Sequence, residues 1–286
     1  MQAQTLPLGN ATITSVTDGA APFPLMTLTT MYPSVPRADW APFQQRYPDC
    51  FDGEEHVRWA YQSYLVRSQG KTILVDTGIG ERPNPFIPGV GGVLLKHLGD
   101  VGCAPEDVDI VLFTHLHIDH VGWNLTLDGK PTFPNARYVM HRDEWESFHR
   151  PEALADPLNG HIPVFVTPLA ELGVLDLLEG DANFTQEVKA ICTPGHTEGH
   201  MSVVVSSGGE QALIAGDVIG HPHDVTEPDW LRHGAFEHDP LVANRTRRAL
   251  LDRIEAESMT VAAGHMPEPG FGRVVRIEGR RWWQPL

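Results

Sequence analysis

Apolar and polar residues alternate near the start of the chain as they do in a half-buried β-strand. Residues 11–16 follow this pattern, and Thr17, Asp18 and Gly19 after them are typical turn residues, so we expect the strand to end there. Two further β-type runs, 57–67 and 72–75, are separated by Gln69 and Gly70. This arrangement predicts a β-hairpin with a tight turn.

The rest of the chain alternates between short apolar runs and longer segments with helical spacing. The apolar runs predict strands at 108–113, 137–140, 188–192, 202–206, 212–215 and 260–263. Helices are expected near 91–98, 143–149 and 241–256. Runs of strands with helices between them indicate two sheets, or one mixed sheet, covered by helices. No internal repeat or low-complexity linker interrupts the chain, so we predict a single domain over residues 1–286.

Residues 20–52 show no clear periodicity and contain six prolines together with several aromatic residues. A long irregular segment of this kind is either disordered or a functional arm or lid. Disordered segments are usually poor in aromatic residues, so we expect an ordered arm. We expect it to pack over the mouth of a site or across the interface of a homodimer.

The formal net charge is −16 at pH 7, and no run of lysine and arginine offsets it locally. Such a surface repels phosphate backbones and anionic lipids, so neither nucleic acid nor a membrane is expected as a partner. Cys50, Cys103 and Cys192 are few and widely spaced, which is typical of a reducing compartment. With no signal-peptide pattern and no apolar stretch of about 18 residues, a cytoplasmic protein is expected.

The strongest chemical signal is the sequence THLHIDH, which follows the apolar run ending at Phe113. His115 and His117 are two positions apart and therefore share one face of an extended segment. If a helix begins directly afterwards, Asp119 and His120 can point back toward them from its first turn. Burying so many polar groups together is costly without a partner, and metal binding accounts for the cluster.

Three more potential ligands occupy equivalent positions, each after an apolar run and a glycine that allows close backbone approach. They are His196 after Gly195, Asp217 after Gly216, and His265 after Gly264. Strand ends that deliver side chains to one edge of a sheet form a rigid scaffold for an active site. We therefore expect these residues to join the cluster that follows Phe113.

The number of candidate ligands indicates two metal ions. Five histidines and two aspartates are too many for one tetrahedral zinc ion but suit two adjacent ions. A carboxylate can bridge two ions through its two oxygens, whereas an imidazole cannot. Two divalent transition-metal ions are expected, zinc first, with manganese, iron and cobalt as alternatives.

The run HLHIDH, together with TPGH, AGD and AAGH downstream, resembles the metallo-β-lactamase superfamily. The resemblance runs from about Asp76 to His265 and implies an α/β fold of the αββα sandwich type. It implies that one metal is held by His115, His117 and His196, and the other by Asp119, His120 and His265, with Asp217 as the bridge. It also implies that Asp76 orients the site without binding metal.

Within this superfamily, the sequence is most similar to the branch that contains methyl parathion hydrolase and some lactonases. The residues that carry this similarity are 265–274 and the proline-rich early region. The true β-lactamases usually have cysteine at the position of Asp217, which disfavours antibiotic cleavage. Glyoxalase II shares the seven ligands but generally carries a helical C-terminal extension, and little chain follows His265 here.

By this resemblance, the expected reaction is hydrolysis of an ester-like bond in a neutral small molecule: a lactone, a carboxylic ester or a phosphotriester. A hydroxide held by both metals would attack the carbonyl or phosphoryl centre. Asp119 and Asp217 are the expected catalytic carboxylates, Asp119 because it can also pass a proton to the leaving group. The alternatives are an iron-dependent thiol or persulfide oxidoreductase on the same fold and a non-catalytic binding protein.

The remaining histidines and aromatic residues are expected to have ordinary structural roles. His200 is expected to support the site without binding metal. Solvated positions are expected for the loop residues His221, His223, His233 and His238 and for the helix residues His141 and His149. Core packing is expected for Trp123 and Phe271, with a place in the substrate wall as the less favoured alternative.

Overall fold

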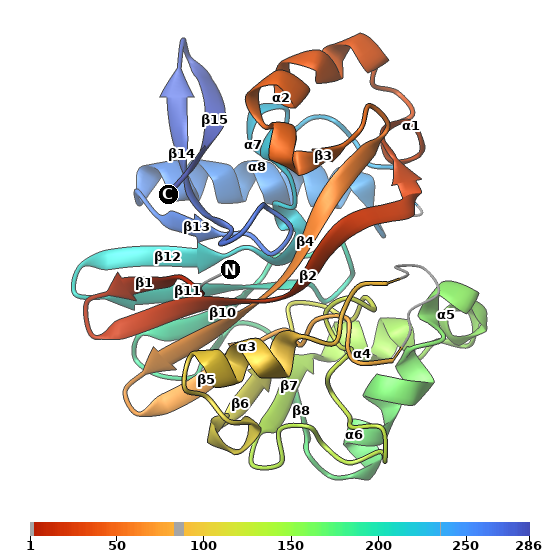
Figure 1. The fold of residues 1–286 in the computed structure, drawn as a ribbon, viewed down its shortest axis with the longest axis vertical. Helices are drawn as coiled ribbons and strands as arrows, with labels where there is room; N and C mark the ends of the chain where they lie inside the picture. Colours follow the sequence, from red (N-terminus) through yellow and green to blue (C-terminus); the bar gives the residue numbers. More distant parts are fainter. Residues whose placement is uncertain (1–2, 83–88, 235) are drawn as a thin grey trace.

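The computed structural model describes residues 3–82, 89–234 and 236–286, and omits the side chains of residues 23–25. The strands of these residues form two mixed sheets (Figure 1). The first sheet has the order β1 (Thr5–Leu8), β2 (Ala11–Thr27), β4 (His56–Ser68), β5 (Lys71–Val75), β6 (Ile110–Leu112), β7 (Arg137–His141) and β8 (Leu175–Leu178), with β3 (Phe51–Asp52) paired to β4. The second has the order β15 (Arg280–Pro285), β14 (Phe271–Ile277), β13 (Thr260–Ala262), β12 (Glu210–Ile214), β11 (Met201–Ser207), β10 (Val188–Cys192) and β9 (Ala182–Asn183).

The two sheets pack face to face through apolar side chains that are almost completely buried. Val66 and Ile73 of the first sheet belong to the same core cluster as Val203 and Ile214 of the second. Burying a side chain of this size contributes about 1.5–3 kcal/mol. The apolar runs that predicted the strands are therefore the interior of the sandwich.

Helices cover the outer faces of both sheets. The longer ones are α3 (Leu94–Asp100), α4 (Arg142–Phe148) and α8 (Pro240–Ala256), and the short ones are α1 (Leu28–Met31), α2 (Ala41–Arg46), α5 (Pro151–Ala155), α6 (Thr167–Glu171) and α7 (Pro222–Thr226). Short helical turns are η1 (Arg37–Trp40), η2 (Pro48–Cys50), η3 (Pro105–Asp107), η4 (Pro157–Asn159), η5 (Ile162–Val166) and η6 (Gly216–Val218). Figure 1 shows α8 on the side of the second sheet and α3 on the side of the first. The expected αββα sandwich is confirmed.

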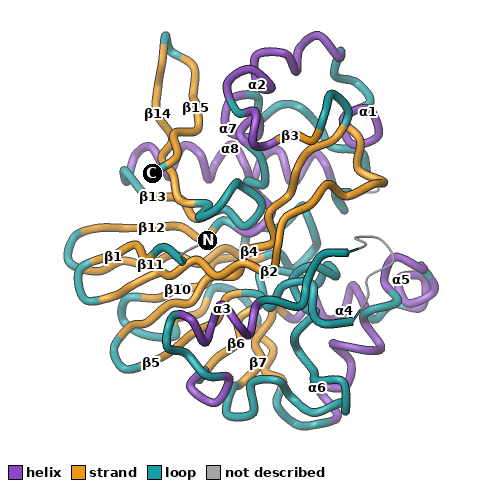
Figure 2. The backbone as a smooth tube through the Cα atoms, viewed as in Figure 1, coloured by secondary structure: helices purple, strands orange, loops and turns teal. Residues whose placement is uncertain are grey.

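Local sequence explains where several of these elements begin and end. The side chain of Asp239 accepts hydrogen bonds from the N–H groups of Leu241 and Val242, so it caps the N-terminus of α8. Gln69 and Gly70 both have positive φ, 51° and 76°, and join β4 to β5 as predicted. The hairpin of β14 and β15, which projects from the body of the molecule in Figure 2, was not predicted.

The prediction that the first strand ends at Thr17 is wrong, because β2 continues to Thr27. Its pairing with β4 shifts register between Thr17 and Ala20, so the turn residues form a bulge within the strand. The bulge leaves Asp18 free to accept hydrogen bonds from the N–H groups of Ile79 and Gly80, both at 2.9 Å. Asp18 therefore holds the loop that contains Ile79 and Gly80, and the strand does not end there.

The expectation of an irregular segment over residues 20–52 is wrong as well, since β2 occupies its first part and α1, η1, α2, η2 and β3 the remainder. A second register shift lies between Pro22 and Thr27. The expectation that the segment is ordered is confirmed. Trp40 and Phe43 are only 1% and 2% exposed and pack in one core cluster with residues of α8 and β15. No helix in the described ranges is long and apolar enough to cross a membrane.

Candidate metal centre

The seven potential ligands come together at one edge of the sandwich, where strands of both sheets end. The loop after β6 carries His115, His117, Asp119 and His120, and the segments after β10, β12 and β13 carry His196, Asp217 and His265. They form two neighbouring groups: a four-residue group of His115, His117, His196 and Asp217, and a three-residue group of Asp119, His120 and His265. The ligand atoms within each group lie within 4.8 Å of one another.

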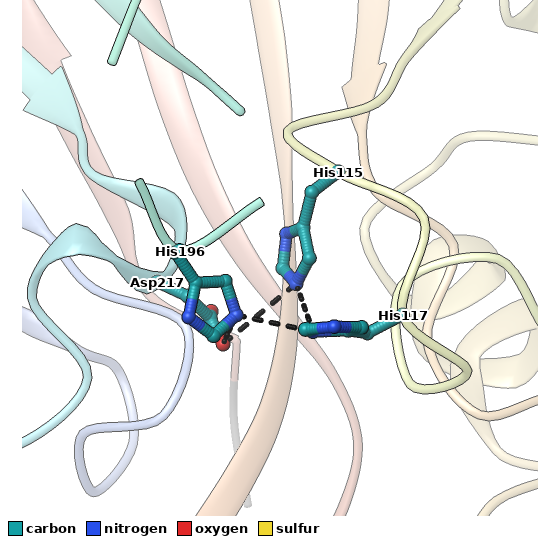
Figure 3. A group of neighbouring side chains, drawn as sticks. All are labelled: His115, His117, His196 and Asp217. Atoms are coloured by element: carbon teal, nitrogen blue, oxygen red, sulfur yellow. Dashed lines mark hydrogen bonds and ion pairs between the residues drawn. The ribbon is translucent and has the colours of Figure 1, made fainter. Parts of the chain in front are cut away.

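The four-residue group is shown in Figure 3, where the three imidazoles and the carboxylate point toward a common centre. Nδ1 of His117 lies 3.0 Å from Nε2 of both His115 and His196. Oδ2 of Asp217 lies 3.2 Å from Nε2 of His196 and 3.8 Å from Nε2 of His115. The group therefore presents three nitrogens and one oxygen.

The three-residue group lies on the other side of the Asp217 carboxylate. Oδ1 of Asp217 is 3.5 Å from Nε2 of His120 and 3.2 Å from Nε2 of His265. Oδ2 of Asp119 is 3.8 Å from Nε2 of His120 and 3.6 Å from Nε2 of His265. Oδ2 of Asp217 is also 3.2 Å from Nε2 of His265, so the carboxylate lies between the two groups and contacts both.

These distances match those between the ligand atoms of one tetrahedral metal ion. Zinc–nitrogen bonds of about 2.0–2.1 Å in tetrahedral geometry place ligand atoms about 3.3 Å apart. Nε2 of His120 and Oδ1 of Asp217 are also buried without a hydrogen-bond partner among the described residues. Buried polar atoms are rarely left without partners, so these two atoms are placed to bind cations. The residues present therefore fit a pair of metal ions.

Hydrogen bonds to Nδ1 of His265 and His115 leave Nε2 of both rings free to bind metal. Nδ1 of His265 donates a hydrogen bond to the carbonyl oxygen of Ala60 at 2.8 Å, because a carbonyl oxygen can only accept. Nδ1 of His115 lies 3.0 Å from Oγ1 of Thr114, whose hydroxyl donates to Oδ2 of Asp76 at 2.8 Å. These contacts set the tautomer and orientation of both rings.

Asp76 and His200 support the centre without joining it, as the sequence indicated. Oδ2 of Asp76 accepts from Nδ1 of His120 at 2.9 Å, and Oδ1 accepts from the N–H of Thr114 at 2.8 Å. Nε2 of His200 accepts from the backbone N–H of Asp217 at 3.0 Å. A Cβ at Gly216 would lie 2.5 Å from Nε2 of His200, so glycine is needed for this approach.

The imidazoles of the four-residue group are poor bases. Burial lowers the pKa of His117 to about 4 and holds the pKa of His115 and of His196 well below the ordinary value. All three rings are therefore neutral at pH 7, the form that binds metal.

The three-residue group behaves differently. Burial alone would lower the pKa of His120, but the carboxylates of Asp119, Asp76 and Asp217 raise it to about 10. Burial also opposes protonation of His265, whose pKa is nevertheless raised, chiefly by Asp217. Without metal, this group holds protons that a bound cation would replace.

A cavity of about 630 Å³ opens over the centre and reaches His117, Asp119 and Asp217. Its apolar lining comes from separate elements, with Trp59 and Tyr61 on β4 and Phe148 on α4. The segment 20–52 contributes Met26 and Met31, so part of it does border the mouth of the site. Its proposed role in a homodimer remains a prediction.

Several sequence expectations for residues around the centre need correction. His221 and His223 are 1% and 0% exposed instead of solvated, because α7 packs them against Tyr32 and Trp40. His141 is also buried, because its side chain accepts the N–H of Asp143 and caps α4.

Other expectations are met. His238 is 52% exposed, with Nε2 3.1 Å from Oε1 of Glu198. Trp123 and Phe271 are core residues and do not line the cavity over the centre. Two aromatic residues of the cavity wall, Trp59 and Tyr61, belong to no recognisable sequence motif. Their two-residue spacing on a predicted strand was the one signal that they share a face.

The "Metallo-beta-lactamase superfamily" family description matches residues 57–265 of this sequence. The chain belongs to that superfamily, and the fold and the histidine–aspartate cluster place it among the metal-binding hydrolases of the superfamily.

Similar proteins include lactonases and another hydrolase. N-acyl homoserine lactonase AiiA of Bacillus thuringiensis subsp. kurstaki is 24% identical over 218 residues, which cover 71% of this chain and 79% of the relative. Among solved structures, the hydrolase AbOPH of the beta lactamase superfamily has a TM-score of 0.85 at 25% identity, covering 100% of this chain and 97% of that one. AidC, a dizinc quorum-quenching lactonase, has a TM-score of 0.80 at 23% identity, with the same coverage of both chains, and shares the fold.

Proposed function

We propose that this protein is a dinuclear metallohydrolase that opens lactones and cleaves related esters. The observation that carries the proposal is the position of the Asp217 carboxylate. Its Oδ2 lies 3.2 Å from His196 and its Oδ1 lies 3.2 Å from His265, so one side chain faces both ligand groups. A carboxylate placed in this way can bridge two cations, as in hydrolases with paired metals.

The chain's own residues divide the work of the reaction. Two metal ions, when bound, would supply Lewis acidity and a nucleophilic water near neutral pH. The imidazoles and Asp217 would hold the ions in place, and the apolar wall of Trp59 and Phe148 would exclude bulk water from the reacting bond. Asp119 has a side chain that is 16% exposed and lines the cavity, so its carboxylate can pass a proton to the leaving oxygen.

The cavity favours neutral, moderately apolar substrates. Apolar side chains such as Trp59 and Phe148 line the cavity together with the acidic residues Glu152 and Asp156, while Glu198 is paired with Arg150 on the same wall. Glu152 and Asp156 would repel an anionic substrate. The named activity of AiiA and AidC supports lactones as the first substrates to test, and the dizinc description of AidC supports zinc. A cytoplasmic location is part of the proposal and rests on the composition alone.

The experiment is a kcat/KM panel of N-acyl homoserine lactones, aryl esters, phosphotriesters and β-lactams, with His117→Ala as the blank. We expect lactones and aryl esters to rank first, phosphotriesters second and β-lactams last. Chelation should abolish each activity and added zinc should restore it. If the blank equals the native protein on every ester and lactone, or if metal-dependent oxygen uptake with a thiol is the only activity, the proposal is wrong.

A further inference from the structure

Glu144 is a buried carboxylate that lies beside the metal centre without facing it. Its residue is 1% exposed and belongs to α4. Oε1 accepts the backbone N–H of Leu116 at 2.9 Å, and Oε2 accepts the backbone N–H of Gly199 at 3.0 Å. One side chain therefore joins two loops that are far apart in sequence.

Both loops carry ligands of the four-residue group. Leu116 lies between His115 and His117, and Gly199 lies three residues after His196. The three imidazoles of the group therefore belong to the two loops that Glu144 connects. A change in the separation of these loops would change the nitrogen–nitrogen distances of 3.0 Å that His117 makes to the other two rings.

The surroundings of the two peptide groups leave little freedom. The carbonyl oxygen of Leu116 lies 2.7 Å from Nε2 of His161, so both the backbone N–H and the backbone C=O of Leu116 are hydrogen-bonded. A Cβ at Gly199 would lie 2.2 Å from the backbone nitrogen of Glu144, so α4 and this loop touch backbone to backbone. Glu144 therefore sits in a tightly packed junction.

The three-residue group is held by other partners. Asp76 fixes His120, and the carbonyl oxygen of Ala60 fixes His265. Neither contact involves Glu144. Asp76 also supports His115 through Thr114, whereas both hydrogen bonds of Glu144 lie beside ligands of the four-residue group.

We propose that Glu144 is a positioning residue that sets the geometry of the four-residue group and leaves the three-residue group unaffected. The proposal rests on the two-metal site of the proposed function. Burial raises the pKa of Glu144 to about 7, and the bonds from Thr197, Leu116 and Gly199 oppose this rise. A cation bound nearby would further favour the carboxylate form, which accepts both N–H groups.

The test measures metal binding instead of activity, with cobalt(II) as a spectroscopic probe. The double variant His120→Ala/His265→Ala keeps the four-residue group, and His117→Ala/His196→Ala keeps the three-residue group. Glu144→Ala and the milder Glu144→Gln are added to each background. We expect Glu144→Ala to raise the cobalt Kd about 10- to 100-fold in the first background, as is typical when a ligand loses its supporting partner, and less than about twofold in the second. Glu144→Gln should show an intermediate loss, because its amide oxygen can still accept one N–H.

Glu146→Ala is the matched control, because Glu146 lies on the same helix with a side chain that is 59% exposed. It should leave the cobalt Kd unchanged in both backgrounds, and circular dichroism of the metal-free variants checks the fold. Equal weakening in both backgrounds would show general loosening and overturn the proposal, as would no weakening by either Glu144 variant. Absence of cobalt binding in both unmodified backgrounds would overturn the two-metal site and this proposal together, whereas failure of lactone hydrolysis alone would leave the positioning role standing.

Discussion

Oδ2 of Asp76 lies 2.9 Å from Nδ1 of His120. Nδ1 donates this hydrogen bond, and Nε2 is directed at Asp119 and Asp217. Asp76 itself has a φ of 62°, a conformation that few residues other than glycine, asparagine and aspartate adopt readily. Asp76 therefore combines an unusual backbone conformation with the orientation of a metal ligand.

The first prediction concerns this contact. Asp76→Ala should weaken metal binding by the three-residue group about 10- to 100-fold, since His120 loses the partner that orients it. The measurement is the cobalt Kd in the His117→Ala/His196→Ala background. Asp109→Ala is the control, because Asp109 is a partly exposed carboxylate next to β6 at the end away from the centre. An equal rise in the cobalt Kd for both substitutions would show that Asp76 does not orient His120.

The second prediction is the pH dependence of metal loading. Without metal, His120 has a pKa of about 10 and is protonated at pH 7, so a metal that binds it must displace the proton. The metal affinity of the three-residue group should therefore rise at least about tenfold per pH unit between about pH 6 and 9, because His265 also has a raised pKa.

The metal affinity of the four-residue group should change much less with pH above about pH 5. The reason is that His117 has a pKa of about 4 and the other two rings have lower-than-normal pKa values. Calorimetry of zinc binding in buffers with different ionisation enthalpies measures the protons released. Equal proton release from the two groups would contradict the different protonation of their histidines.

The third prediction concerns the segment 20–52. Trp40→Ala should lower the free energy of unfolding by about 3–5 kcal/mol, because a large buried ring leaves a cavity. Leu172→Ala is the control, since Leu172 is 46% exposed and should change stability by less than about 0.5 kcal/mol. Denaturant unfolding at constant m-value provides the comparison. Similar small effects of both substitutions would show that the segment contributes little to the core.

The fourth prediction uses the apolar wall of the cavity. Each methylene added to the acyl chain of a lactone substrate should raise kcat/KM about three- to fourfold until the wall is covered, since burying a methylene contributes about 0.8 kcal/mol. A carboxylate at the end of the acyl chain should reverse this gain in kcat/KM, because Glu152 and Asp156 line the same cavity. A flat response to chain length would contradict binding along this wall.

Much of the fold could be predicted because the central strands are apolar runs of the expected length. The segment 188–192 was predicted as a strand and coincides with β10. The ligand loops followed from the same pattern, since each lies directly after such a run. The apolar pattern does not predict how distant segments pair. Asp18 was predicted to be a turn residue, but it lies in a bulge because β2 continues to pair with β4 beyond it.

The supporting residues of the centre were harder to predict for the same reason. Glu144 and Tyr61 lie far from the ligands in sequence and carry no motif, and only the packing of α4 and β4 brings them to the site. His221 and His223 seemed to belong to a polar loop, yet the aromatic residues of the segment 20–52 bury them. The local sequence around these histidines cannot predict burial by a segment almost 200 residues away.

The most direct test of the account is the rate of lactone ring opening as zinc is added stepwise to metal-free protein. Asp217 faces both ligand groups, so we predict that the rate rises until two equivalents per chain are bound and then stays constant. In Asp217→Ala the rate should remain near background, and elemental analysis should show that both ions are bound less tightly. A rate that saturates at one equivalent, or hydrolysis that does not depend on zinc, would contradict a two-metal hydrolase.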